Sequence, residues 1–458
     1  MGVILGQNQY GKAECRVVRI VRDTPRHEIV DLNVTTSLRG DFAAAHISGD
    51  QSQVLPTDTQ KNTAFAYAKE HGVGSIETYA LALGRRLLVA TPAATSARVL
   101  VEQYAWDRVD DGTDGGHDHA FVRRGGETRT CEVVLTRDDA TPPTVTCGLR
   151  DLVVLKSTGS AFKGFLVDEY TTLPETDDRI LATSLVARWR HAGDGVAEQT
   201  DEQWNASYDG VRRTMLSTFA ATFSRALQET LYAMGRATIE QHPTVAEIGF
   251  SAPNKHHFLV DLAPFGLENP GEVFVAADRP YGLIEATVLR SDLATLNEAP
   301  EAEARRLLAE CLDVDRWVQQ VAAGRPYADA DALLAAASAA AEHLDDAELQ
   351  AALARHPRIG ERAGAGHDAA HSASEQAGVD HDDADVTRRL ADGNRAYEQR
   401  FDRVFLIRAK GRDADEILAE LERRLGNDDD AERAETVVQL REIALLRLRA
   451  LVGAEDAS

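Results

Sequence analysis

Apolar and polar residues over the first 290 positions follow the period of strands in some stretches and the period of helices in others. Strands are predicted first, then a pair of helices, then more strands, and this order repeats once. The predicted strands are 15–21, 29–38, 98–106, 120–124, 132–136, 152–156, 180–189, 247–262 and 283–289, and the predicted helices are 58–71, 75–88, 211–223 and 227–239. The doubled pattern favours an α+β fold, with helices packed on one face of an antiparallel sheet.

Beyond about residue 292 the apolar positions keep helical spacing only, and no strand of comparable strength is predicted after residue 300. Pro300 is typical of a helix start, which places the boundary near 295–303. The sequence therefore predicts one domain over 1–292, with units of about 8–150 and 151–290, and an all-α domain over 296–455. The His- and Asp-rich segment 364–385 is interpreted as a polar loop rather than a metal site.

Composition excludes several classes of protein. A net charge of −24 over 458 residues argues against nucleic-acid binding and against binding to an anionic membrane surface. None of the four cysteines stands in a C-x-x-C pair, so a zinc ribbon is not expected. No apolar run approaches the ~18 residues of a membrane span. With no signal peptide recognised, a reduced, cytoplasmic setting is expected.

A Pro-Asn-Lys-His run at 253–256 interrupts the predicted strand 247–262. Proline lacks a backbone N–H, and Asn and Lys are poor strand residues. Local rules broken inside an element often mark functional sites. The chain adds Tyr-Gly-Lys at 10–12, Thr-Asp at 57–58, Leu-Lys-Ser-Thr-Gly-Ser-Ala-Phe at 155–162, Asp-Glu-Tyr-Thr-Thr at 168–172, Asp-Arg-Ile at 178–180 and Gln228. In this order and spacing, residues 8–290 resemble the urate oxidase (uricase) family.

The resemblance implies a tandem T-fold that converts urate, O₂ and water into 5-hydroxyisourate and H₂O₂, with O₂ as co-substrate and with no metal or organic cofactor. An electron-rich urate dianion can itself donate an electron to O₂, so the protein supplies proton transfer, orientation and a polar oxygen pocket. The resemblance implies a homotetramer whose urate sites lie between subunits. It implies a proton relay of Lys12, Thr57 and His256, and substrate contacts from Asp58, Phe162, Arg179, Leu227, Gln228 and Asn254, with Asp58 and Leu227 acting through their backbone.

These residue types suit the chemistry. The planar fork of Arg179 matches an anionic acceptor edge. Gln228 can both donate and accept toward an amide edge, and Phe162 can stack on a purine. Each residue alone also has a simpler role: a solvated charge for Lys12, a helix start for Thr57, an ion pair with Asp177 or Asp178 for Arg179, and core packing for Phe162 and Leu227.

A second set of motifs lies in the helical part. His356-Pro357 ends a helical pattern, and Ser372, Glu375-Gln376-Ala-Gly and Arg447 follow it. With Gly-Asn at 393–394 and Phe-Leu-Ile at 405–407, residues 296–453 resemble the all-helical 2-oxo-4-hydroxy-4-carboxy-5-ureidoimidazoline (OHCU) decarboxylase family. The resemblance implies His356 as the acid, Glu375, Gln376 and Ser372 as substrate ligands, and Arg447 as a carboxylate partner. Arg408 departs from it, because a small residue such as Cys is expected there.

Three hypotheses follow. The first is a bifunctional enzyme of purine catabolism, in which the second domain decarboxylates OHCU to (S)-allantoin. The second is a monofunctional urate oxidase with a structural helical domain. The third is a pterin-type T-fold enzyme. Under the first hypothesis a separate 5-hydroxyisourate hydrolase is expected, since the sequence shows no domain for that step.

Overall fold

A computed structural model of the protein describes residues 3–454 except 139–140, 194, 278, 355–357, 359–383 and 410–411, and for 384–387 it describes the backbone alone. Contacts divide the chain into two compact units, Met1–Arg290 and Ser291–Ser458. The first unit is an α+β structure, and the second is built from helices.

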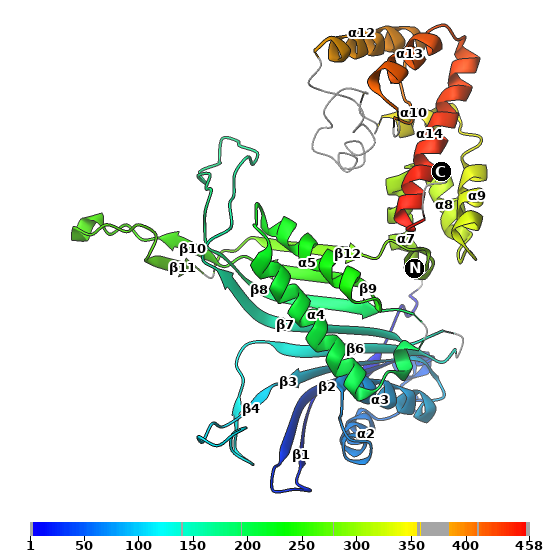
Figure 1. Ribbon diagram of the computed structural model, residues 1–458. Coiled ribbons are helices and arrows are strands. Elements are labelled where there is room, and N and C mark those ends of the chain that lie inside the picture. Colours follow the sequence, from blue (N-terminus) through cyan, green and yellow to red (C-terminus); the bar gives the residue numbers. More distant parts are fainter. Residues whose placement is uncertain are drawn as a thin grey trace. The chain divides into compact units, whose positions relative to one another are not determined.

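The first unit is built on one antiparallel sheet of eight strands in the order β1-β2-β3-β6-β7-β8-β9-β12 (Figure 1). Alternate residues are buried along much of the sheet, as in β2, where Leu32, Val34 and Leu38 are inaccessible to solvent. Because successive side chains point to opposite faces, these apolar residues gather on one face. The strands are β1 (Tyr10–Val21), β2 (Glu28–Gly40), β3 (Ala94–Tyr104), β6 (Thr128–Thr136), β7 (Thr144–Lys156), β8 (Leu181–His191), β9 (Val245–Pro253) and β12 (Leu283–Leu289).

Four long helices cover the apolar face: α2 (Thr57–Glu70), α3 (Ile76–Ala90), α4 (Asp201–Ala221) and α5 (Leu227–Gln241) (Figure 1). Caps determine where two of them begin. The Ser75 side chain accepts the backbone N–H of Thr78, and Thr200 forms a capping box with Gln203. The second cap starts α4 ten residues before the predicted helix 211–223. Shorter helices are α1 (Ala43–Ile47), η1 (Val196–Glu198) and η2 (Ala263–Phe265).

The order of two strands, two helices and two strands occurs twice. The first copy is β1, β2, α2, α3, β3 and β6, and the second is β7, β8, α4, α5, β9 and β12. β6 pairs with β7, so the two copies form one continuous sheet. The predicted α+β fold with a repeated unit is confirmed.

Two small hairpins leave this sheet: β4 (Trp106–Arg108) with β5 (Phe121–Arg123), and β10 (His256–Leu259) with β11 (Phe274–Ala277). The prediction of one strand over 247–262 is therefore wrong, because this stretch is divided between β9 and β10. The Pro253-Asn254-Lys255 run causes the division. The backbone N–H groups of Asn254 and Lys255 donate to Gly282 and Ala182 at 2.8 Å each, and among the described residues β10 then pairs with β11 alone.

His191, at the end of β8, lies in the core of this unit. Its ring meets that of Trp204 edge-on at 5.1 Å, and its Nδ1 lies 3.0 Å from the Thr244 hydroxyl. Its Nε2 is buried and has no hydrogen-bond partner among the described residues. Burial lowers the pKa of His191 to about 4, so the ring is neutral in the folded protein at neutral pH.

The second unit contains α6 (Leu293–Glu298), α7 (Glu301–Cys311), α8 (Asp315–Ala323), α9 (Ala330–Ala340), α10 (Asp346–Leu353), α12 (Ala384–Phe401), α13 (Ala414–Arg424) and α14 (Asp429–Leu451). A fully buried ion pair joins Arg424 to Glu432. Arg424 also donates to the Leu406 carbonyl at 2.7 Å, and Glu432 accepts the Tyr397 hydroxyl. These contacts tie α12, α13 and α14 together. Within the described part of the chain, no helix is long and apolar enough to span a membrane.

Candidate active site

Arg179, which lies just before β8 in the chain, packs against Phe162. The guanidinium carbon of Arg179 is 4.9 Å from the centroid of the Phe162 ring. Arg179 donates its backbone N–H to the Ser160 carbonyl at 2.8 Å, and its Nε lies 3.3 Å from the Ser160 hydroxyl. Burial lowers the pKa of Arg179, but an arginine side chain stays charged in proteins. A partly desolvated cation beside an aromatic ring suits a flat anion.

The predicted alternative of an ion pair between Arg179 and Asp177 or Asp178 is wrong for the described residues. Asp177 pairs with Lys163. Asp178 accepts hydrogen bonds from the Thr158 hydroxyl at 2.8 Å and from the Gly159 N–H at 3.1 Å. Both carboxylates therefore have other partners, which leaves the Arg179 fork for a ligand.

The start of α5 joins this group. Ser160 and Ser224 form a bridge, the Ala161 N–H donates to the Ser224 carbonyl at 2.8 Å, and the Thr230 hydroxyl donates to the Ser224 hydroxyl at 2.7 Å. Leu227 is the first residue of α5 and is buried, whereas the adjacent residue, Gln228, is exposed. The first N–H groups of a helix lack intrahelical partners and favour anions. The structure thus links the segment that carries Phe162 and Arg179 to the start of α5, where Leu227 and Gln228 lie.

Asn254 lies beside β8, the strand that follows Arg179, and His256 opens the hairpin that comes next. Asn254 forms a bridge with Thr183, and Thr183 donates its hydroxyl to the Pro253 carbonyl at 2.9 Å. Thr183 is four residues after Arg179 along the chain. His256 opens β10 opposite Ala277, with its ring stacked on Phe258 at 5.7 Å.

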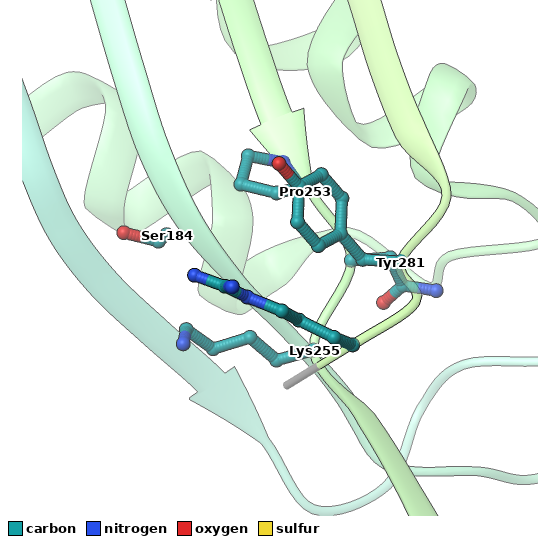
Figure 2. Close-up of a pocket in the computed structure, with 6 residues that line it drawn as sticks. Ser184, Pro253, Lys255 and Tyr281 are labelled. Atoms are coloured by element: carbon teal, nitrogen blue, oxygen red, sulfur yellow. The ribbon is translucent and has the colours of Figure 1, made fainter. Parts of the chain in front are cut away.

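A cavity of about 490 Å³ adjoins this turn, and none of its lining residues is acidic. Figure 2 shows the Lys255 side chain extending toward the strand that carries Ser184, with the Tyr281 ring beside Pro253. Two cations and several polar groups in a chain of net charge −24 suit an anionic ligand. The lining residues are Ser184, Pro253, Asn254, Lys255, Arg279 and Tyr281.

Lys12, Thr57 and Asp58 form a second group at the other edge of the sheet. Lys12 pairs with Thr36 across β1 and β2, and Thr57 is the first residue of α2. The carboxylate of Asp58 pairs with Lys61, and mainly for this reason its pKa is lowered. The nearby ammonium of Lys12 lowers the pKa of Asp58 further, so these side chains share one local field.

One chain does not bring the two groups together. β1 is the edge strand, and β2, β3, β6 and β7 separate it from β8. Neighbouring strands lie about 4.8 Å apart, so Lys12 is about 24 Å from the start of β8 when measured along the sheet. A lysine or arginine side chain extends only roughly 6–7 Å. Within one copy, Lys12 and Thr57 of the predicted relay are thus far from His256.

The predicted decarboxylase residues His356, Ser372, Glu375 and Gln376 lie outside the described residues. Arg447 is buried in α14, with its Nη1 3.5 Å from the Glu310 carbonyl. The backbone N–H of Arg408 donates to the Gln439 side chain at 2.9 Å, and Gln439 lies on the same helix as Arg447.

Two family models match the chain in separate regions. A uricase model matches residues 8–134 and 145–285, together more than half of the chain, and an OHCU decarboxylase model matches 297–449. The chain belongs to the uricase family. It also carries an OHCU decarboxylase domain, so urate oxidation and OHCU decarboxylation are combined in one chain. The predicted family and the bifunctional hypothesis are confirmed, and the pterin-type alternative is set aside.

Known uricases are similar to the first unit. The uricase of Arthrobacter globiformis is 52% identical over 288 residues, which cover 63% of this chain and 90% of that protein. The uricase of Danio rerio is 35% identical over 293 residues, covering 63% and 95%. The crystal structure of Arthrobacter globiformis uricase matches with a TM-score of 0.59 at 52% identity, over 63% of this chain and 96% of that one.

The sequence motifs did not single out several residues that shape the candidate site. Ser160 and Ser224 hold the Phe162 loop against α5, and Thr183 holds the Asn254 turn. Arg279 and Tyr281 line the cavity although they lie about 25 residues beyond Asn254. Only the strand and hairpin geometry could reveal them, because serine, threonine and tyrosine carry no distinctive spacing.

Proposed function

We propose that urate binds between the Arg179 guanidinium, the Phe162 ring and the start of α5. The observation that carries this proposal is the contact of Arg179 with Phe162 at 4.9 Å, on a segment that the Ser160–Ser224 bridge ties to the start of α5, whose first N–H groups lack intrahelical partners. The guanidinium would bind the anionic edge of urate and the ring would stack on its plane. Gln228 would read an amide edge, and the backbone at Leu227 would add a contact.

The complete urate site lies between two copies of the chain in this proposal. The separation of about 24 Å along the sheet supports it. One copy would supply Arg179, Phe162, Gln228, Asn254 and His256. The second would supply Lys12 and Thr57, with Asp58 contributing its backbone. A closed homotetramer would provide such sites symmetrically.

The proposed mechanism uses proton transfer and preorganisation. Lys12, Thr57 and His256 would move protons away from urate, whose dianion then donates an electron to O₂. Asn254 and Thr57 would hold O₂ and later water over the ring. Apart from the single imidazole of His256, these side chains are amide, hydroxyl and ammonium groups, which do not form a metal-ligand set, and this supports a reaction without a metal. The products are 5-hydroxyisourate and H₂O₂.

We propose that the second domain catalyses the loss of CO₂ from OHCU. In this proposal His356 is the acid that delivers the proton to carbon. Glu375, Gln376 and Ser372 would hold the ureido and ring groups, and Arg447 would pair with a carboxylate. The burial of Arg447 supports its role, because a buried guanidinium binds carboxylates more strongly than an exposed one.

Two further expectations complete the proposal. The pathway needs a separate 5-hydroxyisourate hydrolase, since the uricase and OHCU decarboxylase models do not cover that step. A cytoplasmic location is supported by four free, buried cysteines.

The test supplies the purified full-length protein with urate and O₂, adds an independent 5-hydroxyisourate hydrolase, and follows product circular dichroism. Rapid formation of (S)-allantoin supports both proposed sites. Urate loss followed by slow, racemic allantoin would mean that the helical domain is inactive toward OHCU. A chain that consumes no urate would refute the proposed oxidase site.

A further inference from the structure

A polar group lies buried in the core of the first unit, away from the urate residues. Glu77 stands in the first turn of α3, and Cys131 and Cys147 face each other across β6 and β7. Their exposed fractions are 0%, 0% and 2%. One carboxylate oxygen and the two sulfur atoms all lie within 4.8 Å of one another. The Cys147 Sγ is 3.3 Å from Glu77 Oε1.

These separations match the donor set of a small thiophilic cation. Zinc binds sulfur at about 2.3 Å and oxygen at about 2.0–2.2 Å, so adjacent donors in a tetrahedral site lie roughly 3.5–3.8 Å apart. The Cys147–Glu77 contact of 3.3 Å is slightly shorter than this range, and the other separations are at most 4.8 Å. Shifts of about 1 Å or less would place all three donors around one ion.

The charge balance also fits a divalent ion. Arg129 Nη2 contacts Glu77 Oε2 at 2.7 Å, and Arg129 Nη1 contacts the Asn205 amide oxygen at 2.7 Å. The carboxylate and guanidinium are neutral together. A divalent ion that binds both cysteines releases two thiol protons, so the net charge of this buried group does not change. The desolvation cost of an unbalanced buried charge is therefore avoided.

We propose that Glu77, Cys131 and Cys147 form a structural binding site for a thiophilic divalent cation, Zn²⁺ first, with Arg129 orienting the carboxylate. Thiolate ligands select such ions over Mg²⁺ and Ca²⁺. The site would join α3 to the junction of the two sheet halves, because β6 and β7 are the strands that meet there. It takes no part in urate oxidation.

The same residues without a metal would be a hydrogen-bonded part of the core. In that state both cysteines would carry thiols, whereas a bound ion would hold them as thiolates. The two states differ in spectroscopy, because only thiolates give charge-transfer absorption with a transition metal.

The test expresses or refolds the full-length chain with Co²⁺ as the probe, because a buried site fills during folding. We expect one Co²⁺ per chain with thiolate-to-cobalt charge-transfer absorption, and its loss in the Cys131→Ala/Cys147→Ala double variant. The matched control is Cys15→Ala plus Cys311→Ala, which removes the other two buried cysteines and keeps the band.

A second variant keeps the proposal testable if the double variant does not fold. Cys147→Ser preserves volume and removes one sulfur ligand, so the charge-transfer intensity per chain should fall to about half or less, with Co²⁺ affinity reduced more than about tenfold. Three results would overturn the proposal: no charge-transfer band in the folded wild-type protein, an unchanged band in Cys147→Ser, or a disulfide between Cys131 and Cys147 in the purified protein.

Discussion

Subunit complementation tests the divided urate site most directly. Lys12→Met removes the proposed general base, and a loss of roughly a hundredfold or more in urate turnover is expected. Arg179→Gln removes a charged contact worth about 1.5–3 kcal/mol, so a loss of roughly 10- to 150-fold in kcat/KM is expected. Each variant alone should therefore be nearly inactive, although for different reasons.

The expected rescue follows from sheet topology. Lys12 on β1 lies about 24 Å along the sheet from the start of β8, next to Arg179, so the proposed site takes the two residues from different copies. When equal amounts of the two variants assemble at random, about one quarter of sites receive both intact residues. Co-refolded mixtures should then recover about one quarter of wild-type turnover, measured as loss of urate absorbance.

A matched pair controls this experiment. Thr57→Ala disables the same edge of the sheet as Lys12→Met, because Thr57 begins the helix α2 that packs on β1. Mixtures of these two variants should recover no urate turnover, because the β1 edge of every chain carries one of the two substitutions. If the Lys12 and Arg179 variants together remain as slow as either alone after exchange, the divided site is refuted.

Four further predictions concern single residues. Phe162→Ala should raise KM for urate about tenfold or more, the scale of a lost stacking contact, with circular dichroism unchanged; an unchanged KM would contradict substrate stacking. His356→Ala should abolish stereospecific allantoin formation while urate consumption stays normal; loss of both activities would point to a folding role. Arg424→Met leaves the Glu432 carboxylate buried without its ion-pair partner, so urea unfolding should show the helical unit destabilised by about 3–5 kcal/mol. Burial lowers the pKa of His191 to about 4, below the ~6.5 of an unfolded chain. The stabilisation from neutral His191 is thus complete above pH ~6.5 and falls by about 3 kcal/mol as pH drops to 4; His191→Gln should flatten that dependence of urea unfolding on pH.

Sequence periodicity predicted the sheet and its helices because burial on one face imposes a regular pattern. β2 shows this, with Leu32, Val34 and Leu38 all buried. It failed at 247–262, where apolar residues continue through Phe258 and Leu259 although the chain has entered a hairpin that leaves both half-exposed. Periodicity reports the alternation of residue types and carries no information about which strand becomes the partner.

The candidate site was predictable residue by residue but not in space. Motifs marked Arg179 and Phe162, and the structure adds their contact at 4.9 Å. The distance of Lys12 from them depends on strand order, which places β1 at an edge and β8 five positions away. Neither spacing nor composition encodes that order. The Cys131 and Cys147 pair shows the same limit, because a hairpin brings together residues 16 positions apart.

The physical features that favour assembly are the features that would complete the urate site. β1 and β12 are the edge strands, and within the described residues no strand pairs with their outer sides. The face without helices exposes apolar side chains on β1 and β7: Val18, Ile20, Val153 and Leu155 are 55%, 43%, 59% and 52% exposed. Open edges and exposed apolar groups are stabilised by contact with another sheet. A second copy that covers the β1 edge would bury the neighbourhood of Lys12, and under the proposal of a divided site this pairing would supply the base to a partner's Arg179.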